Sequence, residues 1–382
     1  MQREVVVVGG GTMGLASAWA LARAGVRVTV LERFAHHHDR GSHSGYTRII
    51  RQAYHEGESY VPLVREADRE WVELGTRTRK ELLVRTGMIE LGPAHDPELG
   101  KSIAGCVMHG VEHHHLERRE LMRRWPFVVP EDWCGWLTPS GGYLRVGPCF
   151  DALRDEAAAA GATFRYGAQV RAIERGERRR VIIDGEAPIS ADAIVVTAGA
   201  WLPTLMPELM PGKLQRLRRV LTWWTPAPSD VDVLARLPVW AAFDPEGFFY
   251  GFPHGEDGLT GLKIACHTTP LPSEADTPVD PDAVDRELHE RDVAPLRRFI
   301  AERFPIAGTQ LVAHRVCLYT ITPSWDFVID RDPEDPRIVI AGGFSGHGFK
   351  FAPAIGRLVK ELALDPTVAA PPKFALARHR PS

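Results

Sequence analysis

The N-terminal segment contains the pattern that most constrains the fold. Residues 5–8 are an uninterrupted run of valine, typical of a strand buried on both faces of a parallel sheet. A turn of the form Gly-x-Gly-x-x-Gly follows at 9–14. An alanine-rich segment (15–25) then predicts a helix, and an apolar segment (26–32) predicts a second strand that ends at Glu32. This β-α-β order predicts a doubly wound domain that binds a dinucleotide.

Each glycine of this turn has a separate role. Gly9 makes the tight turn, Gly11 lets the backbone approach a pyrophosphate, and Gly14 lets the helix pack closely on the strand. The helix N-terminus then faces the phosphates. Glu32 stands where a carboxylate accepts from a ribose hydroxyl and disfavours a 2′-phosphate. The motif itself is compatible with NAD and with FAD.

Signals of the nucleotide fold return later in the chain. Residues 151–174 predict a helix and two strands, and residues 189–201 predict a buried strand followed by a turn of small residues. Residues 337–364 predict a strand, a glycine loop and a helix. An NAD-dependent dehydrogenase usually has one contiguous nucleotide domain, whereas FAD is longer and touches several loops. The dispersed signals therefore favour FAD.

The intervening segments differ in composition. They are rich in tryptophan, proline and short alternating runs such as 248–253 and 261–268, which predict a mostly antiparallel sheet. We therefore expect an α/β protein with two domains, of the α+β type as a whole. One is a Rossmann-like FAD domain, and the other is an interleaved substrate domain built on the antiparallel sheet. The expected boundaries are 1–80, 147–211 and 317–382 for the FAD-binding domain, and 81–146 and 212–316 for the substrate-binding domain.

Composition excludes several classes of function. The net charge of −3 gives no general basic surface for nucleic acid or an anionic membrane. The five scattered cysteines lack a CxxC pair, and no signal-peptide layout or long apolar run is present, so we expect a cytoplasmic protein without disulfides. Histidine runs occur at 35–39 and 112–115. Adjacent side chains of a strand point to opposite faces, so we expect no metal site there.

Strand alternation selects candidate catalytic side chains. In 261–268, Lys263 and His267 share one face, and the opposite face is that of a core strand. Cys317 and Tyr319 likewise share a face of the next candidate strand. These two strands would line a cleft above a cofactor; alternatively, Lys263 and His267 face solvent. A lone cysteine such as Cys317 is most often a buried core residue.

Two further segments carry charged residues among apolar or glycine neighbours. Arg48 and Arg51 share a face in a helix and lie on opposite faces in a strand, and they are either surface residues or partly buried anion-binding groups. Residues 342–351 form a glycine loop before a helix and include Lys350. The loop lets backbone N–H groups approach a ring or phosphate. The helix N-terminus and the lysine favour negative charge there.

These segments together resemble the monomeric sarcosine oxidase and N-methyltryptophan oxidase family, FAD amine oxidases of the D-amino-acid-oxidase-like class. The resemblance rests on GSHSGYTRIIRQAY (41–54), GLKIACHT (261–268), RVCLYTITP (315–323) and GFSGHGFKF (343–351), in this order behind the glycine motif. It extends over nearly the whole chain. It implies a monomeric FAD enzyme that acts on a small-molecule amine with O2, and the charge and apolar pattern described above predict no nucleic-acid or membrane partner.

The resemblance also implies roles for individual residues. Cys317 would form a thioether to the flavin, and Lys263 would activate O2 as a fixed cation. Arg51 and Lys350 would grip the substrate carboxylate. The other implied catalytic residues are His267 and Tyr319, which would also position the substrate, and Arg48 near the flavin ring. The expected cofactor-binding residues are Gly9, Gly11, Thr12, Met13, Gly14, Glu32, Arg33, Ser42, Ser44, Arg48, Val170, Gly199, Cys317, Gly343, Gly346, His347, Gly348 and Lys350.

Three positions depart from the family pattern. Ser44 and Tyr46 stand where the family commonly has histidine and aspartate, and Trp325 stands where an acidic residue is usual. Ser44 is close to the expected flavin, so the efficiency of covalent attachment stays open. Trp325 follows the strand of Cys317 and would reshape the cavity rim, so the identity of the amine stays open.

The sequence therefore predicts an FAD-dependent oxidase of a carboxylate-bearing secondary amine, with an N-methyl amino acid as the first candidate. The expected reaction is hydride transfer from the neutral amine to flavin, hydrolysis of the imine and reduction of O2 to H2O2. Two alternatives share the scaffold: an oxidase of a cyclic imino acid or biosynthetic amine intermediate, and an FAD dehydrogenase with another electron acceptor. A third is an NAD-binding or catalytically silent flavoprotein.

Overall fold

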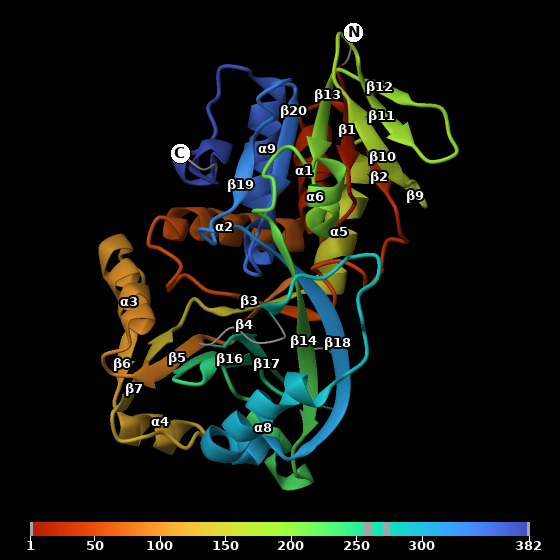
Figure 1. Ribbon diagram of the computed structural model, residues 1–382. Helices are drawn as coiled ribbons and strands as arrows, with labels where there is room; N and C mark the ends of the chain where they lie inside the picture. Colours follow the sequence, from red (N-terminus) through yellow and green to blue (C-terminus); the bar gives the residue numbers. More distant parts are fainter. Residues whose placement is uncertain (1–2, 256–260, 270–275, 380–382) are drawn as a thin grey trace.

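The computed structural model describes residues 3–255, 261–269 and 276–379. Within them, one large sheet lies above another, and helix α2 (Tyr60–Thr78) lies at the level between them (Figure 1). Two long strands, β14 (Gln215–Thr225) and β18 (Gln310–Ile321), rise from the lower sheet toward the upper one. Side chains near their upper ends are therefore brought next to the nucleotide-type sheet.

The upper sheet has the doubly wound arrangement expected from the N-terminal motif. β1 pairs in parallel with β2 and β13, while β13 pairs in parallel with β20 and β2 with β9. β19 pairs with β20 in the antiparallel sense. The strand order is β19-β20-β13-β1-β2-β9, and the strands are β1 (Glu4–Val8), β2 (Arg27–Glu32), β9 (Thr163–Tyr166), β13 (Ala193–Val196), β19 (Val328–Arg331) and β20 (Ile338–Gly342).

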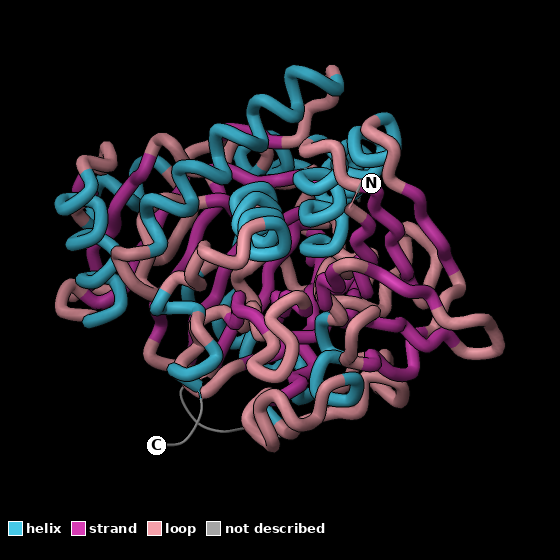
Figure 2. The backbone as a smooth tube through the Cα atoms, turned by 90° about the horizontal axis from the view of Figure 1, so that it is seen from above, coloured by secondary structure: helices cyan, strands magenta, loops and turns pink. Residues whose placement is uncertain are grey.

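Both faces of this sheet are covered, which explains the continuous valine run. Val5 and Val7 pack with the helices of one face, including α2. Val6 and Val8 pack on the other face beneath a small helix and a three-stranded sheet. That small sheet projects on the side opposite α3 (Figures 1 and 2). The covering elements are α1 (Thr12–Arg23), α5 (Val146–Ala159), α9 (Ala352–Leu364), α6 (Leu202–Leu205), β10 (Val170–Glu174), β11 (Arg179–Ile183) and β12 (Ile189–Ala191).

The lower sheet is antiparallel except where β5 pairs with β15. Apolar residues of one face pack with helix α8 (Glu290–Arg303), so the other face is turned toward the middle of the molecule. The strand order is β18-β14-β17-β16-β15-β5-β7-β6, and the remaining strands are β5 (Met88–Pro93), β6 (His114–Leu116), β7 (Trp133–Thr138), β15 (Val239–Asp244), β16 (Gly247–Gly251) and β17 (Leu262–Thr268).

A second three-stranded sheet, separate from the β10–β12 sheet, lies against that inner face. Lys263 of β17 donates to the backbone oxygen of Thr47 at 2.9 Å and to its hydroxyl at 2.8 Å, which joins the two sheets. The small sheet consists of β3 (Thr47–Ile50), β4 (Leu83–Arg85) and β8 (Gly142–Arg145). The other helices are α3 (Pro97–His109), α4 (Arg118–Arg124) and α7 (Val231–Leu234).

The predicted α/β fold class is confirmed, and the alternating strands of 248–253 and 261–268 lie in the antiparallel sheet. The division into two interleaved domains remains a proposal. β18 runs without a break through residue 317, so the expected boundary falls inside a strand. Among the described helices, none combines the length and apolar character that crossing a bilayer requires.

Candidate active site

A cavity of about 330 Å³ begins at the glycine turn after β1 and reaches Cys317 on β18. It also contacts the segments that follow β2, β13 and β20. Because these strands are parallel, their carboxyl ends meet at one edge of the sheet, where doubly wound proteins bind ligands. Of the expected cofactor residues, those that line it are Gly9, Gly11, Thr12, Met13, Glu32, Arg33, Ser42, Arg48, Val170, Gly199, Cys317, Gly343, Gly346 and Gly348.

The glycine turn is packed too tightly for side chains at two positions. A Cβ on Gly14 would lie 1.8 Å from the backbone oxygen of Gly9, so Gly14 lets α1 approach β1. Gly9 has φ +101°, and a Cβ there would lie 2.5 Å from the backbone oxygen of Thr197. The Thr197 hydroxyl donates to the backbone oxygen of Gly9 at 2.9 Å. The turn is therefore held open for a ligand that approaches the backbone closely.

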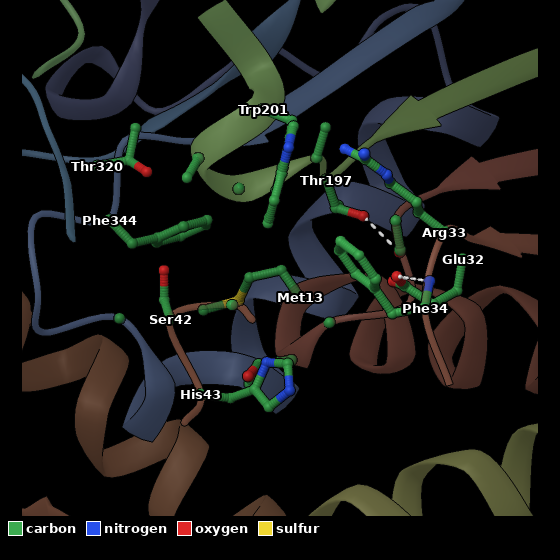
Figure 3. A pocket seen from close by; sticks show the side chains of 18 of the residues that line it. Met13, Glu32, Arg33, Phe34, Ser42, His43, Thr197, Trp201, Thr320 and Phe344 are labelled. Carbon is green, nitrogen blue, oxygen red and sulfur yellow. Dashed lines mark hydrogen bonds between the residues drawn. The ribbon is translucent and has the colours of Figure 1, made fainter. Parts of the chain in front are cut away.

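Glu32 holds the dinucleotide end of the cavity. Its carboxylate accepts from the backbone N–H of Gly10 at 2.7 Å and from that of Phe34 at 2.8 Å. Burial raises the pKa of Glu32, and these backbone bonds oppose the rise. In Figure 3, Glu32, Arg33 and Phe34 lie across the pocket from Ser42 and Phe344. Glu32 therefore also fixes the backbone of the glycine turn, next to the place where a ribose would bind.

Several lining residues escaped sequence reasoning. Phe34, His38 and His43 follow β2, and Trp201 follows β13 (Figure 3 labels three of them). The Nε2 atom of His38 is buried without a hydrogen-bond partner in the described structure and lies 3.7 Å from Glu32. Only their position in the sequence could have identified these residues, because each follows a strand whose carboxyl end lies at the ligand-binding edge of the sheet.

Four expected cofactor residues lie outside the lining. Gly14 packs α1 on β1, as described above. Ser44 has a buried hydroxyl without a hydrogen-bond partner in the described structure, and its backbone oxygen accepts from Arg48 at 2.6 Å. His347 contacts the Tyr54 hydroxyl at 2.8 Å and the backbone oxygen of Trp325 at 3.1 Å. The fourth, Lys350, is described below.

Cys317 lies on the inner face of the lower sheet, as the alternation predicts. Its side chain is 2% exposed and packs with Leu217, Leu221 and Tyr319. Burial raises the pKa of the Cys317 thiol, while the nearby cation of Arg48 opposes this rise. The cysteine is thus both a core residue and a wall of the cavity, so the two readings of this residue are compatible.

Lys263 is a buried cation and does not face solvent. Its side chain is 1% exposed, so the solvent-facing alternative is wrong for this residue. Besides its bonds to Thr47, the ammonium lies 4.3 Å from the ring centre of Phe252 and 5.6 Å from that of Trp223. These contacts fix a positive charge on the inner face of the sheet.

His267 and Tyr319 form a pair on the same inner face. His267 Nδ1 lies 2.9 Å from the Tyr319 hydroxyl. Burial lowers the pKa of His267 well below its usual value, so the imidazole is neutral at pH 7. The ring centres of Phe248 and Trp325 lie 5.7 and 5.9 Å from that of His267. Trp325 adopts a left-handed backbone with φ +63°, which is strained for a side chain of this size.

The two arginines of 41–54 diverge because β3 is extended. Arg48 donates to the backbone oxygens of Ser42 and Ser44 and lines the cavity. Arg51 is buried, and its guanidinium donates to both Glu56 oxygens at 2.8 and 2.7 Å. A Glu90 oxygen lies 3.8 Å from Arg51. Sequence reasoning did not find these two acids beside the expected carboxylate anchor.

Lys350 is buried close to Arg51. Its ammonium donates to the backbone oxygen of His347 at 2.9 Å and to the Tyr54 hydroxyl at 3.4 Å. Lys350 and Arg51 lie 5.3 and 4.3 Å from the ring centre of Tyr54. Burial and the charge of Arg51 lower the pKa of Lys350 to about 7. Within the described residues, no carboxylate lies within 4 Å of this ammonium.

The expectation that adjacent histidines diverge is wrong at 35–39. This segment is a turn and not a strand, and His36 Nε2 and His37 Nε2 both lie near Asp151 Oδ1, at 3.0 and 2.9 Å. At 112–115, the three histidines contact different partners.

Comparison with known proteins agrees with this geometry. A family model described as FAD dependent oxidoreductase matches residues 4–362. Monomeric sarcosine oxidase of Bacillus sp. (strain B-0618) is 34% identical over 94% of this chain and 92% of its own length. N-methyl-L-tryptophan oxidase of Yersinia pestis (strain Pestoides F) is 31% identical over the full length of both chains.

Solved structures share the fold of this chain. NikD, described as an unusual amino acid oxidase essential for nikkomycin biosynthesis, has a TM-score of 0.83 at 26% identity and covers 98% of each chain. L-proline dehydrogenase from P. horikoshii shares the fold, with a TM-score of 0.82 at 20% identity over 99% of this chain and 97% of its own. The resemblance, the FAD dependence and the enzyme class expected from the sequence are confirmed. The chain belongs to the family of FAD dependent oxidoreductases, in the group of monomeric sarcosine oxidase and N-methyl-L-tryptophan oxidase.

Proposed function

We propose that the chain is an FAD-dependent oxidase of a secondary amine that carries a carboxylate, with an N-methyl amino acid as the substrate class. The single observation that carries the carboxylate is the buried ammonium of Lys350, which lies close to Arg51 and has no carboxylate within 4 Å among the described residues. A buried charge is stabilised by a partner of opposite sign. A substrate carboxylate supplies that partner.

Arg51 can contribute to the same anchor. Its three short hydrogen bonds, to Ala53 and to the two oxygens of Glu56, use at most three of the five guanidinium N–H groups. Both cations contact the ring of Tyr54, so a carboxylate that reaches Lys350 is also close to Arg51. Such charge-assisted bonds hold the acid end of the substrate in one orientation.

The His267–Tyr319 pair would receive the amine end. His267 is neutral at pH 7 because burial lowers its pKa. In the tautomer whose Nδ1–H donates to the Tyr319 oxygen, Nε2 is an acceptor and holds a substrate N–H without protonating the nitrogen. A neutral secondary amine still carries one N–H, so this contact is compatible with the neutral form, whose lone pair assists hydride loss.

The lining fits FAD, with the glycine turn at one end of the cavity and Cys317 in the wall contributed by β18. When bound, FAD supplies the two-electron acceptor and the route to O2. Lys263 would stabilise negative charge as it develops on oxygen, since the ammonium is held in place by Thr47 and two aromatic rings. We also propose a thioether between Cys317 and the flavin, because its sulfur is in the cavity wall. The cytoplasmic location and the monomeric state stay predictions.

A second candidate is oxidation of a cyclic imino acid or a biosynthetic amine intermediate. The ring centres of Trp325 and Phe248 both lie within 6 Å of that of His267, and this aromatic surrounding favours a planar or ring-shaped substrate. The structural likeness to NikD supports the same candidate. An FAD dehydrogenase with another acceptor would use the same substrate cavity and lack the role given to Lys263.

A peroxide assay on the FAD-loaded enzyme tests these candidates. Sarcosine and N-methyltryptophan represent the N-methyl class, and proline and pipecolate represent the cyclic class. We expect H2O2 in proportion to amine consumed with at least one N-methyl amino acid. Turnover of an amine with an artificial dye and without peroxide would identify a dehydrogenase, and a flat response across the panel would contradict the proposed function.

A further inference from the structure

The chain contains two histidine runs of similar composition that are folded in different ways. At 112–115, His113 contacts the backbone oxygen of Val111, His114 contacts Glu112, and His115 contacts Glu117. At 35–39, in contrast, two histidines meet a third residue that is distant in sequence. His36, His37 and Asp151 each present one ligand atom, and these three atoms lie within 4.8 Å of one another.

The spacing of this second group is close to that of a metal site. Each histidine Nε2 lies 2.9–3.0 Å from Asp151 Oδ1, and the two imidazole rings have centres 4.3 Å apart. Ligand atoms of a tetrahedral Zn²⁺ site are about 3.3 Å apart, given metal–nitrogen bonds of about 2.0 Å. The two Nε2–Oδ1 distances are therefore a few tenths of an ångström shorter than this spacing, and the two nitrogens lie within 4.8 Å of each other.

The surroundings also suit metal ligands. The Tyr166 hydroxyl lies 3.3 Å from His36 Nδ1, where an outer hydrogen bond orients a metal-bound imidazole. Arg154 lies 3.7 Å from Asp151 and opposes a cation, but it is engaged by Asp155 at 2.6 Å.

We propose that His36, His37 and Asp151 form a binding site for a divalent ion of the Zn²⁺, Cu²⁺ or Ni²⁺ class. Two imidazole nitrogens and one carboxylate select these ions over Mg²⁺ and Ca²⁺, which prefer oxygen ligands. Three protein ligands leave at least one position for water, and His37 is 55% exposed, so the ion reaches the site from solvent.

The site would link helix α5 to the segment after β2, which lines the dinucleotide end of the cavity. The segment after β2 contributes Arg33, Phe34 and Ser42 to the lining, and Asp151 belongs to α5. An ion bound by His36, His37 and Asp151 holds this segment against α5. We therefore expect the metal to slow release of FAD. Where FAD is covalently attached, the same restraint appears as a higher unfolding temperature.

The test uses the full-length, FAD-loaded protein without a histidine tag. Zn²⁺ is titrated in competition with a chromophoric chelator. We expect one equivalent of tight binding in the wild type, and a loss of affinity of more than about tenfold in His37→Ala and in Asp151→Asn. The control His114→Ala changes the other histidine run and should leave the affinity unchanged.

A second measurement distinguishes binding at this site from nonspecific binding of Zn²⁺ to other histidines. Zn²⁺ should slow FAD release, or raise the unfolding temperature, in the wild type and in His114→Ala but not in His37→Ala. His37 is mostly exposed, so its removal leaves the fold intact. Absence of a saturable equivalent in the wild type, or the same loss in His114→Ala as in His37→Ala, overturns the proposal.

Discussion

Lys350 provides the sharpest test of how the substrate is held. Its ammonium is buried close to Arg51, and its described hydrogen bonds go to neutral oxygens of His347 and Tyr54. Lys350→Met removes the charge and retains most of the side-chain volume. If a substrate carboxylate is the missing partner, the variant should bind carboxylate ligands much more weakly while keeping its fold and its FAD.

The size of the effect follows from the burial. Removing one partner of a buried, hydrogen-bonded charge pair costs about 2–5 kcal/mol. With about 1.4 kcal/mol for each tenfold change, the dissociation constant should rise by about 30-fold to several thousand-fold. Arg51 keeps its charge at every accessible pH, so binding should weaken without disappearing.

The pH dependence gives an independent signature. The pKa of Lys350 is about 7 in the free protein, so the ammonium is charged below pH 7 and neutral above it. A bound carboxylate raises that pKa. Affinity should therefore be highest below pH 7 and fall about tenfold per pH unit above it, until the pKa of the complex is reached. Lys350→Met should be flat over the same range.

The assay is a titration of the FAD-loaded enzyme with a thioether analogue, in which sulfur replaces the amine nitrogen, followed by the flavin absorbance. Lys360→Met is the matched control, because Lys360 lies in α9 near the surface and 4.0 Å from Glu361. An unchanged dissociation constant in Lys350→Met, or the same pH slope as the wild type, would refute the assignment of Lys350 as a carboxylate anchor.

Four other changes test other parts of the site. Lys263→Met should slow the reaction with O2 far more than anaerobic flavin reduction, as measured by stopped flow; equal losses would remove its role toward O2. Cys317→Ser should release FAD into the supernatant on acid precipitation, whereas the wild-type precipitate stays yellow; a colourless wild-type precipitate contradicts covalent attachment. Burial raises the pKa of Glu90 from 4.5 to about 7. The free energy of unfolding should therefore fall by about 3 kcal/mol as the pH rises from 4.5 to 7. Urea unfolding of Glu90→Gln should lack that fall, and parallel slopes for the two proteins would count against it. Gly346→Ala should lower FAD occupancy, because a Cβ there would lie 2.3 Å from the Tyr319 ring at φ +81°. Gly185→Ala, with φ +68° and open space, is its control for backbone strain, and equal occupancy in the two variants would exclude the steric effect.

The sequence predicted which side chains share a face of β17 and β18, but it left open whether the face of Lys263 is turned toward solvent or toward a cofactor. Ile264 packs against the α8 side of the lower sheet, and the side chains of Lys263 and Cys317 are buried on the opposite face. A period of two is enough to separate the two faces, but it does not show that both faces are buried. The glycine turn was predictable for a similar reason, because a Cβ at Gly14 cannot coexist with the backbone of Gly9.

The contacts of Arg51 were not predictable in the same way. Glu90 comes from β5 in the lower sheet, and its approach to Arg51 depends on how β3 lies on that sheet. The meeting of His36 and His37 at Asp151 depends on a turn and on the docking of α5. Trp325 lies beside His267, and its own backbone is left-handed within a short turn. Local patterns do not encode such long-range placements.

The most direct measurement of the proposed function is anaerobic bleaching of the flavin by matched amines. An N-methyl amino acid is compared with the N-methylamine that lacks only its carboxylate, at equal concentration and in the absence of O2. The proposed function predicts rapid bleaching by the amino acid, slow or no bleaching by the simple amine, and recovery of the oxidised spectrum with H2O2 when air is admitted. Equal bleaching by both amines would contradict the carboxylate anchor, and bleaching by no amine would contradict amine oxidation itself.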